Sequence, residues 1–86
     1  MSDDTMLTEL MLTLEAARIN CGYTLVEAAK KFNIHRDTLW KYEQDSTRVS
    51  RTFMLRVYEV YGIPKEQIFF GKKSEFFRIR NKMSAS

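Results

Sequence analysis

The chain has 86 residues, which is enough for one domain, and its 44% apolar and 13% aromatic residues can fill one small core. Its net charge of +3 permits nucleic-acid binding without requiring it, because many proteins that bind no nucleic acid carry the same charge. One His, one Cys and three Gly, with no glycine-rich loop, argue against an enzyme and against a metal or other cofactor.

The first predicted helix begins near the N-terminus. Thr13 is a suitable N-cap for it, and Gly22 is a suitable residue to end it. Between these two positions, Leu14, Ala17 and Ile19 are expected to face the interior.

The next helical pattern covers residues 25–32, where helical spacing groups Leu25, Ala28, Ala29 and Phe32 on one face. The two small alanines allow the backbone of another helix to come close. A sharp crossing between two short helices needs such a close approach.

A further helix is predicted over residues 36–44. Leu39 and Tyr42 form its apolar side, and the remaining face is polar and aromatic, with Arg36, Asp37, Trp40, Lys41 and Gln44. Together with the preceding helix it suits a helix-turn-helix, a motif that places its second helix in the DNA major groove.

The turn between these two helices has three residues. Asn33 is expected in the left-handed conformation that ends the first helix, because Asn is the commonest substitute for Gly there. Ile34 should point inward. His35 is either an N-cap near a DNA phosphate or a helix-start residue with no DNA contact, and a metal ligand is not expected because the chain has no second His.

After a polar loop over residues 45–49, Ser50 is expected to cap a fourth helix over residues 51–61. Gly62 closes this helix, and Pro64 is placed to begin a short fifth helix that runs through residue 68. The large apolar residues of the fourth helix are expected in the core, namely Phe53, Leu55, Val57, Tyr58, Val60 and Tyr61.

The C-terminal segment allows two interpretations. Residues 75–80 alternate in part and contain aromatic and β-branched side chains, so they can form a strand that pairs with residues 10–14 of the same chain or of a second copy. The alternative is a basic tail that touches phosphates.

Several short pieces of the chain follow one another in a familiar order: Ala16-Ala17-Arg18, Gly22-Tyr23-Thr24, Glu27-Ala28-Ala29, Leu39 to Glu43, Tyr61-Gly62-Ile63 and Ile68-Phe69. Their joint order and spacing resemble the Xre-like helix-turn-helix family of phage repressor and Cro type. The resemblance covers residues 13–70, and it leaves residues 1–12 as an N-terminal extension and residues 71–86 as a basic C-terminal extension and possible dimerisation strand. It implies an all-α, five-helix domain similar to that of lambda repressor.

The resemblance also carries residue roles. Arg18 and Glu43 match a family ion pair that joins the first helix to the end of the third, which we interpret as structural. Leu25 stands where the family often has Gln, and that phosphate contact is not expected here. Asn33 and Asp45 replace two usual glycines, and Asp45 can also occupy a left-handed cap.

Four side chains of the third helix are the candidates for reading bases. Arg36 can donate two hydrogen bonds to guanine, and Asp37 can accept from cytosine or hold Arg36 in position. Lys41 can reach a guanine or a phosphate. Trp40 can pack on a thymine methyl group or a sugar, or against the loop after the helix.

The candidates for phosphate contacts lie around this helix. Thr24 can cap the second helix and leave its amide groups aimed at a phosphate. The other candidates are polar or basic side chains at either end of the third helix and in the loop that follows it: His35, Gln44, Ser46, Thr47, Arg48 and Arg51.

We therefore expect a small prokaryotic or phage transcriptional regulator, a Cro-like repressor that binds double-stranded operator DNA as a homodimer. No signal peptide and no apolar run of about 18 residues is visible, so we expect no membrane partner and a place in the cytoplasm of a bacterial or phage-infected cell. No small-molecule ligand is expected. The alternative is an antitoxin or another protein-binding module on the same fold.

Overall fold

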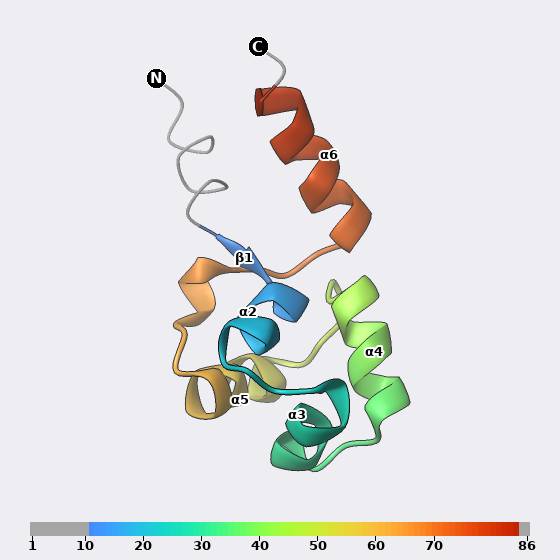
Figure 1. Ribbon diagram of the computed structural model, residues 1–86, viewed down its shortest axis with the longest axis vertical. Helices are drawn as coiled ribbons and strands as arrows, with labels where there is room; N and C mark the ends of the chain where they lie inside the picture. The colour runs from blue at the N-terminus through green and yellow to red at the C-terminus, as the bar shows by residue number, and fades with distance from the viewer. Residues whose placement is uncertain (1–10, 85–86) are drawn as a thin grey trace.

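The computed structural model describes residues 11–84, with side chains up to residue 82. In this part of the chain the elements are β1 (Leu12–Thr13), α2 (Leu14–Asn20), α3 (Leu25–Phe32), α4 (Arg36–Gln44), α5 (Arg51–Tyr61), the 3-10 turn η1 (Lys65–Gln67), β2 (Ile68–Phe69) and α6 (Lys73–Ser84) (Figure 1). The predicted all-α fold class is confirmed. No helix among residues 11–84 is long and apolar enough to cross a membrane.

Local signals in the sequence set where the helices begin and end. The hydroxyl of Thr13 accepts a hydrogen bond from the amide of Ala16 at 3.0 Å, and the hydroxyl of Ser50 accepts from Phe53 at 3.0 Å. Both are N-caps of the kind that satisfies a free amide in the first helical turn. Gly62 ends α5 at a φ of +70°, a conformation that costs glycine little because it has no Cβ. The predicted bounds of α3, α4 and α5 are confirmed.

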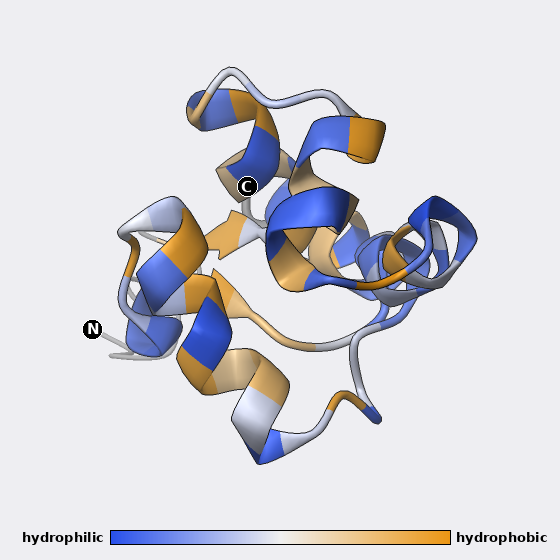
Figure 2. Ribbon diagram, turned by 90° about the horizontal axis from the view of Figure 1, so that it is seen from below, coloured by the Kyte–Doolittle hydropathy of each residue, from blue (hydrophilic) through white to orange (hydrophobic). Residues whose placement is uncertain are grey.

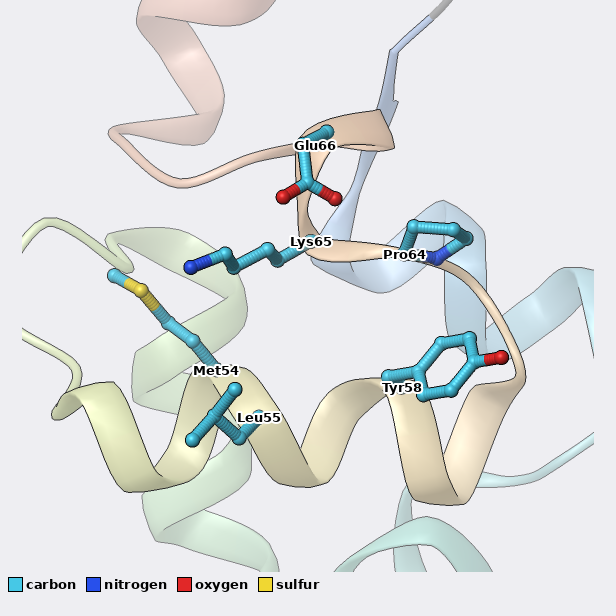
Figure 3. Close-up of a pocket in the computed structure, with 6 residues that line it drawn as sticks. All are labelled: Met54, Leu55, Tyr58, Pro64, Lys65 and Glu66. Atoms are coloured by element: carbon cyan, nitrogen blue, oxygen red, sulfur yellow. The ribbon is translucent and has the colours of Figure 1, made fainter.

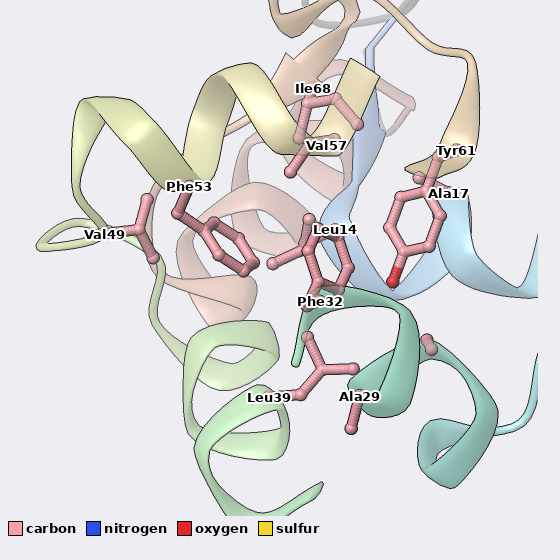
Figure 4. Packing of buried hydrophobic residues seen from close by; sticks show 11 residues of the cluster. Leu14, Ala17, Ala29, Phe32, Leu39, Val49, Phe53, Val57, Tyr61 and Ile68 are labelled. Atoms are coloured by element: carbon pink, nitrogen blue, oxygen red, sulfur yellow. The ribbon is translucent and has the colours of Figure 1, made fainter. Parts of the chain in front are cut away.

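The core lies between α2, α3, α4 and α5 and is centred on one aromatic side chain (Figure 4). The ring of Phe32 stacks on Phe53 with 4.7 Å between centroids, and meets Tyr61 edge to face at 5.3 Å. Such pairs add about 0.5–1.5 kcal/mol each beyond the apolar area they bury. Ala28 and Ala29 are buried where α3 packs against its neighbours. Each helix shows both hydrophilic and hydrophobic bands when coloured by hydropathy (Figure 2).

Three residues expected in the core lie at the surface instead. Ile19 is 60% exposed in the last turn of α2, and Leu55 and Tyr58 are 54% and 58% exposed on α5. The reason on α5 is helical spacing: Phe53 and Val57, four residues apart, face inward, which turns Leu55 to the opposite side and Tyr58 to the flank of the helix. These three predictions were wrong.

The strand expected over residues 75–80 is also wrong, because these residues belong to α6. Phe76 is buried and its ring lies 5.2 Å from that of Phe69, between centroids, so this one anchor holds the start of the helix against the body. The rest of α6 extends away from the other helices (Figure 1). Nζ of Lys73 lies 2.6 Å from Oε1 of Glu15 and ties the same end of α6 to α2.

A short strand pair does form, but with a different partner. β1 runs parallel to β2, with Leu12 opposite Ile68 and Thr13 opposite Phe69. Residue 10, also expected in this pairing, lies outside the described residues. The fifth helix expected from Pro64 is limited to the three residues of η1, so the fifth α-helix of the described chain is α6.

Candidate nucleic-acid interface

α3, which precedes α4 across a three-residue turn, begins with a reciprocal pair of hydrogen bonds. The amide of Glu27 donates to the hydroxyl of Thr24 at 3.1 Å, and the amide of Thr24 donates to the Glu27 carboxylate at 2.8 Å. This capping box satisfies two amides. Hydrogen bonds from the backbone and the hydroxyl of Thr24 hold the pKa of Glu27 below its ordinary value. The box leaves the amides of Leu25 and Val26, in the same turn, for an outside acceptor such as a phosphate.

The turn between α3 and α4 is built around a left-handed residue. Asn33 has a φ of +58°, and it is the only non-glycine residue with positive φ among residues 11–84. The amide of the next residue, Ile34, reaches back to the carbonyl of Ala29 at 3.0 Å and closes the end of α3. Ile34 packs against the core. The predictions for both turn residues are confirmed.

A side chain from α5 also holds this turn, and the sequence did not reveal it. The Arg56 guanidinium donates to the carbonyls of Phe32 and Lys31, each at 2.9 Å. A cation that donates to the last carbonyls of a helix stabilises its C-terminal end. Arg56 is 24 residues from Phe32 along the chain, so no local spacing pointed to the contact.

The first residues of α4 form a small charged cluster at the surface. His35 is the N-cap, because its Nδ1 accepts from the amide of Asp37 at 3.1 Å. The Asp37 carboxylate lies 3.6 Å from the same Nδ1 and 3.9 Å from Nε of Arg36. The carboxylate therefore lies within reach of both neighbours, and its position fits a role in holding Arg36.

The four predicted base-reading side chains share the exposed face of α4. Arg36, Asp37 and Lys41 are all exposed, and Trp40 is 53% exposed, so its ring stands in solvent rather than in the core. The opposite side of α4 is fixed, because Leu39 is fully buried. This leaves one helix face of about two turns free to meet a partner.

Arg18 and Glu43 are joined as the resemblance implied. Nε of Arg18 donates to Oε2 of Glu43 at 2.7 Å and Nη2 donates to Oε1 at 3.3 Å, while Nη1 donates to the carbonyl of Tyr23 at 2.9 Å. Burial raises the pKa of Glu43 above its ordinary value, and the hydrogen bond and charge of Arg18 oppose that rise. The guanidinium thus ties α2, the loop before α3 and the last turn of α4 together, which fixes the direction of α4.

The loop after α4 differs from the expectation at two residues. Ser46 is buried, its amide donates to the carbonyl of Gly71 at 2.9 Å, and its hydroxyl accepts from the amide of Gly71 at 2.9 Å. A phosphate contact by this side chain does not fit its burial. Asp45 has an extended φ of −151° and is bridged to Lys72, so the expected left-handed cap is also wrong. A partner far along the chain decides both conformations.

The remaining candidates for phosphate contacts differ in their exposure and in the hydrogen bonds that they already make. Both the amide and the hydroxyl of Thr47 donate to the Asp45 carboxylate, which lowers the pKa of Asp45. Gln44 is half-buried and borders a hollow shared with the first turn of α6. Arg48 and Arg51 are exposed, on either side of Ser50.

A family model described as a helix-turn-helix domain matches residues 9–68, which is more than half of the chain. The chain belongs to this helix-turn-helix domain family. No curated protein sequence matches the chain.

In this helix-turn-helix domain, α3 and α4 are the two helices of the motif and α4 is its second helix. The motif is a DNA-binding module, so the chain is a DNA-binding domain of a type that is typically not enzymatic. The match ends at residue 68, and α6 lies beyond the part of the helix-turn-helix domain that the family model covers.

Proposed function

We propose that the chain is a sequence-specific regulator of transcription, a Cro-like repressor, that places α4 in the major groove of double-stranded DNA. One observation carries the proposal: the exposed face of α4 presents Arg36, Asp37, Trp40 and Lys41 together, while its other face is locked into the core. An exposed face of that composition, directly after the turn of a helix-turn-helix, suits contact with base edges.

Arg36 is the main base-reading residue in this proposal. Its guanidinium matches O6 and N7 of guanine, the commonest direct contact in the major groove. The Asp37 carboxylate, 3.9 Å from Nε of Arg36, orients that group and repels phosphates, which favours a base over the backbone. Lys41, about one turn further along, reaches a guanine or a phosphate, and Trp40 packs on a thymine methyl group or a sugar.

Phosphate contacts position the domain on the duplex. The amides of Leu25 and Val26 beyond the Thr24 cap, the exposed ring of His35, and the guanidinium groups of Arg48 and Arg51 are available for this role. Thr47 is a weaker candidate because its hydroxyl already donates to Asp45. Gln44 would act from the end of α4, where it is half-buried.

The regulator would bind as a homodimer to a near-palindromic operator with half-sites about 34 Å apart, one helical turn of DNA. Repression would follow from occupation of a site that overlaps a promoter. Both statements rest on the likeness to repressors of this type and on the symmetry that a two-fold dimer imposes on its site.

The test is selection from random duplexes, followed by titration of the selected site over a series of salt concentrations. We expect an enriched, near-symmetric sequence whose binding survives competitor DNA and weakens steeply with salt, because phosphate contacts release counterions. Arg36→Ala should lose preference for that site, whereas Arg80→Ala, which removes the same charge from an exposed residue of α6, should keep it. No enrichment, or equal affinity for random duplex, would overturn the proposal.

The alternative is a protein-binding module on this fold, such as an antitoxin. An exposed apolar groove beside α5 favours a protein partner of some kind. If this were the sole function, the selection would yield no preferred DNA sequence.

A further inference from the structure

The exposed side of α5 and η1 forms an apolar groove on a face that the proposed DNA contact does not use. The groove encloses about 360 Å³ and is lined by Met54, Leu55, Tyr58, Pro64, Lys65 and Glu66 (Figure 3). Leu55 and Tyr58, one turn apart, are each more than half exposed. Adjacent exposed apolar side chains of this size are typical of a contact surface for another macromolecule.

The groove is held in shape by the core beneath it. The inward face of α5 is buried at Val57 and Tyr61, so the helix cannot rotate to hide its outer face. Gly62 turns the chain sharply after α5, and the buried Ile68 fixes the far end of η1. A partner therefore meets a preformed surface and loses little free energy in ordering it.

Charge around the groove indicates what kind of partner fits. Helical spacing puts Glu59 on the same side of α5 as Leu55, and Lys65 and Glu66 lie on η1, so the surface carries charges of both signs and no excess of positive charge. A surface with both signs can complement a copy of itself across a two-fold axis, where Lys65 of each copy meets an acid of the other. It offers no comparable attraction to nucleic acid.

The other candidate for self-association is α6, and its charges are unfavourable for it. Its described residues carry Lys73, Arg78, Arg80 and Lys82 against the single acid Glu75. Two such helices side by side would repel one another. The C-terminal extension was a candidate dimer contact because its expected strand could pair with a second copy. The segment is a helix, so that strand pairing does not apply.

We propose that the groove between α5 and η1 is the surface through which two copies of this chain pair, with Leu55 and Tyr58 of each copy packed against the groove of the other. This inference rests on the proposed function, because a near-palindromic operator calls for two domains related by a two-fold axis. α4 and α5 meet on their inner sides, where the rings of Tyr42 and Phe53 lie 4.8 Å apart between centroids. Pairing through the exposed side of α5 therefore leaves the exposed face of α4 free.

The first test measures the mass of the full chain in solution by sedimentation at several concentrations. We expect a dimer, and we expect Leu55→Glu to raise its dissociation constant by at least about 30-fold, as for a residue at the centre of an interface. Ile19→Glu is the matched control, because Ile19 is 60% exposed on α2, outside the groove, and should leave the dimer intact. Tyr58→Lys serves as a second variant if Leu55→Glu fails to fold.

A second arm separates this inference from the proposed function by comparing a half-site duplex with the complete operator. Leu55→Glu should bind the half-site within about twofold of the parent and lose the tighter binding to the complete site that pairing provides. A parent chain that binds the half-site but stays monomeric would overturn the pairing and leave the DNA-binding function standing. A dimer that selects no DNA sequence would overturn the DNA-binding function and leave the pairing standing. If Phe77→Glu dissociated the dimer and Leu55→Glu did not, the contact would belong to α6 and the proposed groove would be ruled out.

Discussion

Nε of Arg18 lies 2.7 Å from Oε2 of Glu43, whose side chain is only 1% exposed, and this contact links α2 to the last turn of α4. The two residues are 25 positions apart in sequence. The direction in which α4 leaves the body therefore depends on this buried ion pair.

Replacing Arg18 by Met is expected to destabilise the fold by about 3–5 kcal/mol at neutral pH, because the Glu43 carboxylate is left buried without a counter-charge. Burial raises the pKa of Glu43, and loss of Arg18 raises it further. A carboxyl group with a raised folded pKa favours folding fully below its unfolded pKa of about 4.3, and that contribution is lost as the pH rises through the folded value. Urea unfolding of Arg18→Met should show a smaller loss of unfolding free energy, relative to the parent, near about pH 4 than near about pH 7.

The control for this prediction is the double variant Arg18→Met, Glu43→Leu. Because it removes the buried charge as well as its partner, it should recover most of the lost free energy of unfolding. A loss of equal size at both pH values in Arg18→Met would contradict the account.

Thr24→Ala is expected to reduce the free energy of unfolding by about 1 kcal/mol, because it removes the hydroxyl that caps α3. Hydrogen bonds from Thr24 lower the pKa of Glu27, so the contribution of Glu27 is present above its unfolded pKa and is lost as the pH falls through the lowered folded value. The difference in free energy of unfolding between the parent and Thr24→Ala should therefore become smaller at acidic pH. Thermal unfolding at about pH 7 and about pH 3 measures it, and Thr24→Ser should behave like the parent.

Arg56→Met is expected to reduce the free energy of unfolding by about 1–2 kcal/mol, because two hydrogen bonds from a charged group to the carbonyls of Phe32 and Lys31 are lost. Arg56→Lys should recover only part, since an ammonium group lacks the fork that reaches both carbonyls. Urea unfolding of the three chains gives the comparison. If Lys restored full stability, charge alone and not the bidentate contact would explain the effect.

Arg36→Ala should cost roughly 1–3 kcal/mol of binding to the preferred site and relax selectivity at one base position. The reason is the loss of a two-point contact to guanine rather than of a general attraction to phosphate. A titration against the preferred site and its single-base variants measures both effects. Equal affinity of variant and parent would remove Arg36 from its proposed role.

The parts of the fold that follow from neighbouring residues could be predicted from the sequence. Capping by Thr24 and Ser50, the left-handed Asn33 and helical spacing gave the bounds of α3, α4 and α5. Helical spacing also placed the face that carries Arg36 and Trp40 outward. Each of these features is decided within a few residues of the chain.

The parts that failed depend on distant partners. Phe76 lies in a segment whose sequence alternates as in a strand. The segment forms α6 instead, and the ring of Phe76 packs against the distant Phe69. Ser46 looked like a surface loop residue because Gly71, which satisfies its amide and hydroxyl, is 25 residues away. Arg56 gave no sign of its role, since an arginine on a helix usually lies in solvent.

Ala28 and Ala29 are almost completely hidden between the motif helices and their neighbours. α3 can lie this close to the rest of the domain because the side chain at each of these two positions is a single methyl group. Adding even one or two methylene groups there would wedge the motif open and change the direction of the exposed face of α4, while every side chain on that face stayed the same.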